Sequence, residues 1–226
     1  MNTHLETTRS ITVLGATGRV GRLVTAQALD RGLSVTALVR DPSRLPAELT
    51  ARGDGLLRVV HGELDDVAAM RAAVSGSQAI VVAVGVRYRG RHPWSGISGR
   101  PDVAPTAVRS LLAAGEPWQR VVLPSAFGAG DSWRALPAVV RAVISTSALK
   151  ISYSGLTQAE QLVRSTGWRA TVARAVTLTD GPATGRRVQT DDRAVRGNPK
   201  VSRADVARLL LDLALADDAP EVVTAA

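Results

Sequence analysis

Three glycines spaced three residues apart interrupt an apolar run near the start of the chain and limit what can follow it. The segment 11–21 reads ITVLGATGRVG, and a helical apolar stripe follows at Val20, Leu23, Val24 and Ala28. Gly15 permits backbone angles that other residues avoid, Gly18 removes a side chain where a pyrophosphate must approach, and Gly21 lets helix and strand pack closely. This pattern predicts a strand that turns into a helix around a dinucleotide, with a simple tight turn as the alternative.

The next apolar segment, 33–40 with the sequence LSVTALVR, predicts a second strand that ends at Arg40. In a dinucleotide-binding fold this end lies beside the adenine ribose, where NAD requires a carboxylate. A guanidinium instead suits the extra phosphate of NADP, and Arg19 and Arg44 add positive charge nearby. We therefore expect NADPH as the cofactor in preference to NADH. The alternatives are that arginine is merely abundant here, or that Asp41 accepts from the ribose.

Strand and helix patterns alternate along the rest of the chain. Strands are predicted at 56–60, 78–84, 119–123 and 168–174, and the run at 78–84 is continuously apolar, as is typical of a parallel strand covered on both faces. Helices are expected on the stripe of Leu64, Val67, Met70 and Val74, at 103–114, over 158–164, and after the capping-box residues Ser202 and Asp205. The sequence thus predicts one doubly wound α/β domain, 1–226, with a parallel Rossmann-like sheet and a small C-terminal substrate-side region at 177–199.

Composition excludes several functional classes. The net charge is +8, but the arginines are dispersed, so no nucleic-acid partner is expected. The chain has no cysteine and its three histidines are scattered, so no metal site is expected. The longest apolar stretch, 79–86, is too short for a membrane span and the first residues are polar. We expect a cytoplasmic protein without membrane association.

Several motifs follow one another in a characteristic order over nearly the whole chain. They are GATGRVG at 15–21, LVRDPSRL at 38–45, HGELDD at 61–66, IVVAVG at 80–85, VVLPSAFG at 121–128, AEQLVRSTGWRATVAR at 159–174, LTDGP at 178–182 and SRADVA at 202–207. In this order they resemble the atypical short-chain dehydrogenase/reductase superfamily, specifically its NmrA-like and biliverdin-reductase-B-like group of NAD(P)-binding proteins.

The resemblance implies a set of cofactor contacts. The pyrophosphate would meet Gly15, Thr17, Gly18, Arg19, Val20 and Gly21. The ribose phosphate would meet Arg40, the adenine Glu63 and Leu64, and the ribose Ala83, Val84 and Gly85. Ser125, expected just after the fifth strand, would approach the nicotinamide. The alternative for each position is a loop or packing residue.

The resemblance also implies a catalytic pattern, which this chain only partly keeps. Better-known members use a tyrosine as proton donor, a lysine four residues later, and a serine that orients the carbonyl. Ser125 and Tyr153 match the serine and the tyrosine, but the lysine position is Thr157, and the relatives' proline after Arg174 is Ala175. Without the cation the phenol is a poor base at neutral pH. Both matching residues could equally be structural.

This departure favours acceptors that need little proton assistance. A plain ketone requires a proton at its developing alkoxide, whereas quinones, enones, flavins and linear tetrapyrroles spread the incoming charge. The glycine-rich stretch 86–100 is the expected substrate loop, in which Tyr88 and Trp94 could stack on a planar acceptor, with a disordered surface loop as the alternative. Trp133 precedes an apolar helix that could cover this pocket or pair with a second subunit, which leaves a homodimer open.

Three functional hypotheses follow from these observations. The leading one is an NADPH-dependent reductase that transfers hydride to a conjugated carbonyl or quinone-like small molecule. The second is a non-catalytic, NmrA-type regulator that senses the dinucleotide through a protein partner. The third is a non-redox enzyme that cyclises, isomerises or couples a polyketide-like substrate. The missing lysine is compatible with all three.

Overall fold

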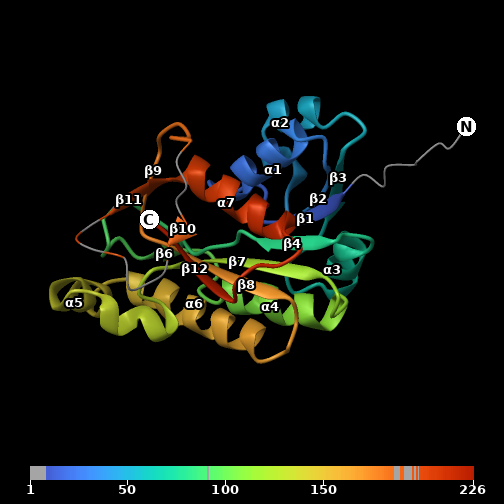
Figure 1. Cartoon of the computed structure of the whole chain (residues 1–226). Helices are drawn as coiled ribbons and strands as arrows, with labels where there is room; N and C mark the ends of the chain where they lie inside the picture. The colour runs from blue at the N-terminus through green and yellow to red at the C-terminus, as the bar shows by residue number, and fades with distance from the viewer. Residues whose placement is uncertain (1–8, 91, 186–188, 191–194, 196, 198) are drawn as a thin grey trace, which may run out of the picture.

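A sheet with one reversal in its strand order organises the molecule (Figure 1). The computed structural model describes residues 9–90, 92–185, 189–190, 195, 197 and 199–226. In this part of the chain the sheet has the order β10-β12-β8-β7-β4-β1-β2-β3 and is parallel except for the β10–β12 pair. Its strands are β1 (Ser10–Leu14), β2 (Ser34–Val39), β3 (Leu57–His61), β4 (Ala79–Val82), β7 (Arg120–Ala126), β8 (Ala170–Ala175), β10 (Gln189–Thr190) and β12 (Val222–Ala225).

Helices cover both faces of the sheet, as the alternating pattern predicts. Figure 1 shows α1 and α7 on one face, and α4 and α6 on the other. The helices are α1 (Gly21–Asp30), α2 (Ala47–Arg52), α3 (Val67–Val74), α4 (Val103–Ala114), α5 (Ala138–Thr146), α6 (Leu149–Arg164) and α7 (Arg203–Leu215), with 3-10 turns η1 (Pro42–Arg44) and η2 (Gly130–Ala135). The doubly wound, Rossmann-like α/β architecture in one domain is confirmed.

The continuous apolar strands feed two separate cores because successive side chains point to opposite faces. In β1, Ile11 and Val13 pack with α1 and α7, whereas Leu14 packs with α3, α4 and α6. In β4, Val81 joins the first core and Ile80 the second. All five side chains are fully buried, so neither strand can tolerate the polar alternation of a half-exposed sheet.

The reversal in strand order lies at β1, whose neighbours are β2 on one side and β4 on the other. The chain proceeds outward through β2 and β3 and then returns past β1 to β4. In open α/β sheets such a switch point leaves a crevice outside the carboxyl ends of the strands, where ligands bind. Two small strand pairs add to the fold, β5 (Arg87–Tyr88) with β6 (Ile97–Ser98) and β9 (Thr177–Thr179) with β11 (Lys200–Ser202).

Several boundaries differ from the sequence prediction. β7 extends to Ala126, so Ser125 lies inside the strand rather than after it. α6 begins at Leu149, so Tyr153 lies inside the helix rather than ahead of it. α3 begins at Val67, capped by Asp66 through the Ala68 and Ala69 amides, so Leu64 precedes the helix. Val67 itself is 37% exposed and is not part of the buried stripe.

The C-terminal region is fixed by the cap of α7. The predicted cap at Ser202 is present, because its Oγ accepts from the Asp205 amide at 3.0 Å. The Asp205 carboxylate accepts from the backbone N–H of Thr184 at 3.0 Å and thereby ties the segment after β9 to α7. Short strands occur in the predicted substrate-side region, although residues 186–188, 191–194, 196 and 198 lie outside the described residues. Among the described helices, none combines the length and apolarity needed to cross a membrane.

The glycine turn yields a stability prediction. Gly15 has φ +86°, and a Cβ there would lie 2.5 Å from the Ala83 carbonyl oxygen, whereas Gly32, with φ +72°, has open space around it. Gly32→Ala should cost only the left-handed backbone penalty, about 1–2 kcal/mol. Gly15→Ala adds a backbone collision worth roughly a further 1–3 kcal/mol. Chemical denaturation of both variants checks this, and equal losses would contradict the close contact.

Candidate functional site

The turn between β1 and α1 is packed against the carboxyl end of β4. The Gly18 N–H donates to the Gly15 carbonyl at 2.8 Å and closes the turn. A Cβ on Gly21 would lie 2.1 Å from the Gly15 oxygen, so only glycine permits this approach of helix to turn. The contact with Ala83 brings together two predicted cofactor segments, 15–21 and 83–85, that are far apart in sequence.

Backbone donors at the start of α1 are available to an anion. Within the described part of the chain, the N–H groups of Thr17, Arg19 and Val20 have no hydrogen-bond acceptor. The helix has no side-chain cap at Val20 and no acidic residue in its first turn. Donors at the positive end of a helix dipole bind phosphate well. The turn therefore fits the pyrophosphate of a dinucleotide.

The carboxyl ends of β2 and β3 place the residues predicted to contact the adenosine part of the cofactor. Arg40 Nε lies 3.8 Å from Glu63 Oε1, and both side chains are more than half exposed. Such an exposed ion pair is weak, so the guanidinium of Arg40 can bind another anion. The Asp41 carboxylate instead accepts from the Ser43 hydroxyl and amide, and these bonds lower its pKa. Leu64 packs partly against the core on the α3 face.

Arg19 links the glycine turn to the C-terminal region. Its guanidinium pairs with Asp180, just after β9, and the other oxygen of Asp180 accepts from Arg203 at the start of α7 at 2.7 Å. The side chains of Arg19 and Asp180 are each 57% exposed. One carboxylate thus joins two arginines across the expected ligand crevice.

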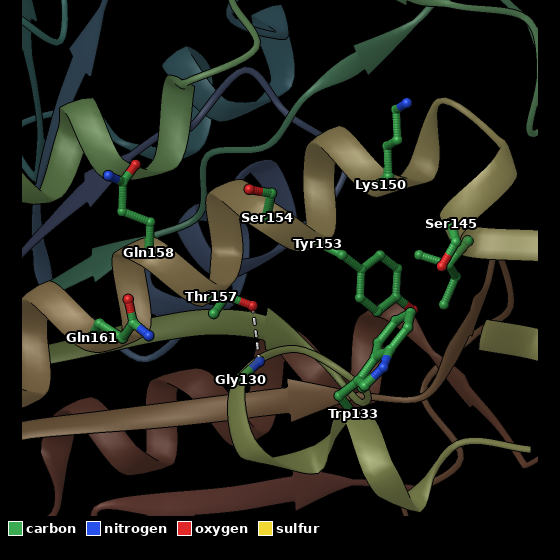
Figure 2. A pocket seen from close by; sticks show the side chains of 11 residues that line it. Gly130, Trp133, Ser145, Lys150, Tyr153, Ser154, Thr157, Gln158 and Gln161 are labelled. Atoms are coloured by element: carbon green, nitrogen blue, oxygen red, sulfur yellow. Dashed lines mark hydrogen bonds between the residues drawn. The ribbon is translucent and has the colours of Figure 1, made fainter. Parts of the chain in front are cut away.

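Tyr153 lies in the wall of a cavity of about 590 Å³ between α6, α5 and the turn after β7 (Figure 2). Its hydroxyl donates to the Phe127 carbonyl at 3.4 Å, two residues beyond Ser125. The Trp133 ring meets the Tyr153 ring edge-on, with centroids 6.4 Å apart. Burial, and secondarily the charge of Tyr88, raise the pKa of Tyr153 above its usual 10.0, so the phenol is a hydrogen-bond donor and not a base.

Neither the residue at the predicted lysine position nor the nearby Lys150 places a positive charge beside Tyr153. The Thr157 Oγ1 accepts from the Gly130 N–H at 2.9 Å and so anchors the turn above α6. Lys150 precedes Tyr153 by one helical turn, but Figure 2 shows its side chain pointing away from the phenol ring. No residue of the glycine turn lines this cavity, which leaves Tyr153 between the cavity and the carboxyl end of β7.

Within the predicted substrate loop, β5 pairs with β6, and Tyr88 and Pro93 contact the start of α6. The Tyr88 and Ser152 hydroxyls share a hydrogen bond, and the Ala148 N–H donates to the Pro93 carbonyl at 3.0 Å. Trp94 is 51% exposed and contacts the His92 ring at a centroid distance of 4.8 Å. The loop expected to contact substrate is therefore ordered against the helix that carries Tyr153, while Trp94 remains at the surface.

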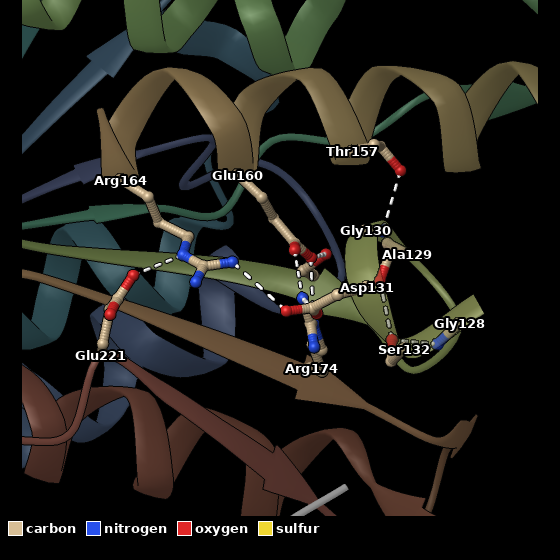
Figure 3. Close-up of polar contacts among 11 residues, drawn as sticks. Gly128, Ala129, Gly130, Asp131, Ser132, Thr157, Glu160, Arg164, Arg174 and Glu221 are labelled. Atoms are coloured by element: carbon tan, nitrogen blue, oxygen red, sulfur yellow. Dashed lines mark hydrogen bonds and ion pairs between the residues drawn. The ribbon is translucent and has the colours of Figure 1, made fainter. Parts of the chain in front are cut away.

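Ser125 belongs to a buried polar cluster that the sequence analysis did not anticipate. Its hydroxyl donates to Glu160 Oε1 at 2.5 Å, and Arg174 Nη2 donates to Glu160 Oε2 at 2.6 Å. Glu160 and Arg174 are each 1% exposed (Figure 3). The available signal was Arg174 itself, because a charge within an apolar strand needs a buried partner of opposite sign.

Comparisons with known proteins show relatives in sequence and in fold. Over 221 residues the chain is 27% identical to an uncharacterized chloroplastic protein of Arabidopsis thaliana, which covers 93% of this chain and 74% of that protein. ChuY from Escherichia coli O157:H7, described as an anaerobillin reductase, is 24% identical with a TM-score of 0.72, over 95% of each chain. A short-chain dehydrogenase/reductase from Veillonella parvula in complex with NADP is 20% identical with a TM-score of 0.72, over 96% of this chain and 93% of that one.

A family model for NAD(P)H binding matches residues 15–217, which include the glycine turn, all strands from β2 to β11 and the cap of α7. The match covers most of the chain and begins at the first glycine of the turn whose amides face the crevice. The chain belongs to the NAD(P)H-binding family, and it shares its fold with solved structures that include a short-chain dehydrogenase/reductase.

Proposed function

We propose that this protein is an NADPH-dependent reductase that transfers hydride to a conjugated carbonyl or quinone-like small molecule. The observation that carries the proposal is the glycine turn, whose free amide donors face the crevice in a chain of the NAD(P)H-binding family. When bound, the dinucleotide supplies the hydride. The reductase and the NADP complex among the structural neighbours support the same chemistry.

Charge at the end of β2 supports NADPH over NADH. The guanidinium of Arg40 is exposed and held only by a long contact to Glu63. Asp41, the alternative ribose acceptor, already caps η1 through Ser43. A guanidinium matches the charge and the planar geometry of phosphate oxygens, which a ribose hydroxyl does not require.

The residues around Tyr153 support a conjugated acceptor. The phenol is a neutral donor, and among the described residues neither neighbour supplies a cation beside it, because Thr157 binds the Gly130 amide and Lys150 points elsewhere. Such a group can donate a hydrogen bond but is poorly suited to deliver a proton rapidly to an alkoxide. An acceptor that spreads charge over many atoms demands less of it. We propose a planar small molecule as the substrate, with neither nucleic acid nor membrane as a partner.

The first prediction concerns turnover. The purified protein should oxidise NADPH steadily when a quinone or enone is supplied and not with the cofactor alone, because hydride transfer requires the acceptor. A spectrophotometric assay with a panel of quinones, enones and plain ketones measures this, and plain ketones should be the slowest. Dinucleotide binding without turnover of any acceptor would instead favour the NmrA-type regulator.

The second prediction concerns cofactor choice. Arg40→Asp should lower the preference for NADPH over NADH by at least about tenfold, since a charge-assisted hydrogen bond of roughly 1.5–3 kcal/mol is lost. Calorimetric affinities for both cofactors provide the ratio. Arg58→Asp makes the same charge change on β3, opposite Thr36 and near the amino end of the strand, and should leave the ratio near that of the native chain. An unchanged ratio in Arg40→Asp would defeat the phosphate assignment.

The third prediction concerns Tyr153. The chain has two tyrosines, so Tyr88→Phe leaves Tyr153 as the sole phenol, and its absorbance titration should give a pKa above 10.0. Because a raised pKa extends the neutral form upward in pH, the donor persists through pH 10 and is lost only above it. Tyr153→Phe should lower kcat on enones by about tenfold, the effect of one lost hydrogen bond. An unchanged kcat would make Tyr153 a wall residue.

A further inference from the structure

Ser125 lies at the end of a buried chain of charges that crosses three elements. The parallel register of β7 and β8 sets Ser125 directly opposite Arg174, and α6 places Glu160 over both strands. Arg174 contacts both carboxylate oxygens of Glu160, with Nε 3.3 Å from Oε1 and Nη2 2.6 Å from Oε2. Figure 3 shows the Glu160 carboxylate and the Arg174 guanidinium pointing toward each other between helix and sheet.

The surroundings hold this pair in one arrangement. A Cβ on Gly130 would lie 2.5 Å from Glu160 Oε2 and 2.9 Å from Arg174 Nη2, so the turn after β7 closes directly over the pair. Arg174 Nη2 also lies 2.5 Å from Asp131 Oδ1, and Arg164 bridges Asp131 and Glu221. The guanidinium therefore has carboxylates on two sides, and the turn after β7 packs closely over the Glu160 carboxylate.

These contacts settle which atom carries the proton in the bond between Ser125 and Glu160. An arginine does not lose its proton in proteins, so the buried pair is ionic and Glu160 is a carboxylate. A carboxylate accepts hydrogen bonds and has no proton to donate. The 2.5 Å bond therefore uses the single hydroxyl proton of Ser125. What Ser125 retains for any other partner is the lone pairs of its oxygen.

We propose that Glu160 is a positioning residue that fixes Ser125 as a hydrogen-bond acceptor, and that the ligand group it serves is the carboxamide N–H of the nicotinamide. This inference rests on the proposed function and on the family resemblance, which implies that Ser125 approaches the nicotinamide. It reverses the polarity expected of a serine that orients a substrate carbonyl, because such a serine must donate. Donation to the substrate oxygen then falls to Tyr153, because its hydroxyl proton is held by a long, 3.4 Å bond to the neutral Phe127 carbonyl that a substrate oxygen can replace.

The test compares NADP with its acetylpyridine analogue, in which a methyl ketone replaces the carboxamide and no N–H remains. Ser125→Ala should weaken the binding of NADP about tenfold, the effect of one lost hydrogen bond, and change the binding of the analogue less than about twofold. Ser77→Ala removes another buried serine hydroxyl, two residues before the amino end of β4 and so away from the carboxyl ends of the strands, and should alter neither affinity. Titration calorimetry measures all of these affinities without turnover.

A second variant reverses the direction of the hydrogen bond between residue 160 and Ser125. In Glu160→Gln the side-chain amide can donate to Ser125, which frees the serine proton for the ligand. NADP should then bind more weakly than to the native chain, and the acetylpyridine analogue more tightly, since its ketone oxygen accepts. Thermal denaturation shows whether this variant is folded, and if it is not, the Ser125→Ala comparison decides alone.

The outcomes distinguish the acceptor role of Ser125 from the proposed reductase function. Equal losses for NADP and the analogue in Ser125→Ala, or no loss for either, would overturn the acceptor role while leaving the reductase proposal intact. Failure of the native chain to bind any pyridine dinucleotide would overturn the proposed function and this inference with it. Selective loss for NADP supports both.

Discussion

The close contact between the glycine turn and the end of β4 is the constraint on which the rest of the site depends. Backbone atoms of Gly15, Gly21 and Ala83 approach to distances that no Cβ would allow. This contact sets where α1 begins relative to β1, and therefore where its free amides point. It also lies at the reversal in strand order, so the donors face the crevice that the topology opens.

Most of the architecture could be predicted from sequence because it follows from local patterns. The central strands are continuously apolar since alternate side chains such as Val81 and Ile80 enter different cores. The elements that escaped prediction are short or polar. β12 has four residues and depends on pairing with β8, while the first half of α6 carries Lys150 and Ser154, which line the cavity rather than a core. Tyr153 was consequently expected outside a helix that in fact contains it.

The candidate site also contains some residues that local sequence patterns identify and others that only the tertiary structure brings together. The glycine turn and Arg40 could be identified because a backbone requirement and a strand end are local features. The association of Ser125 with Glu160 and Arg174 could not, since it arises only when β7, β8 and α6 converge. A buried ion pair gains little net stability over an apolar replacement. Its presence beside the expected nicotinamide position is better explained by what it does to the serine.

The bridge from Arg19 through Asp180 to Arg203 has a consequence for how a phosphorylated ligand is received. The Asp180 carboxylate contacts the guanidinium groups of both arginines and so restrains the Arg19 side chain beside the glycine turn before any ligand arrives. A phosphate that displaces it at Arg19 finds the guanidinium already ordered, so less rotamer entropy is lost on association. Asp180 can remain with Arg203 after the exchange, so the protein keeps a counter-charge at the start of α7 throughout.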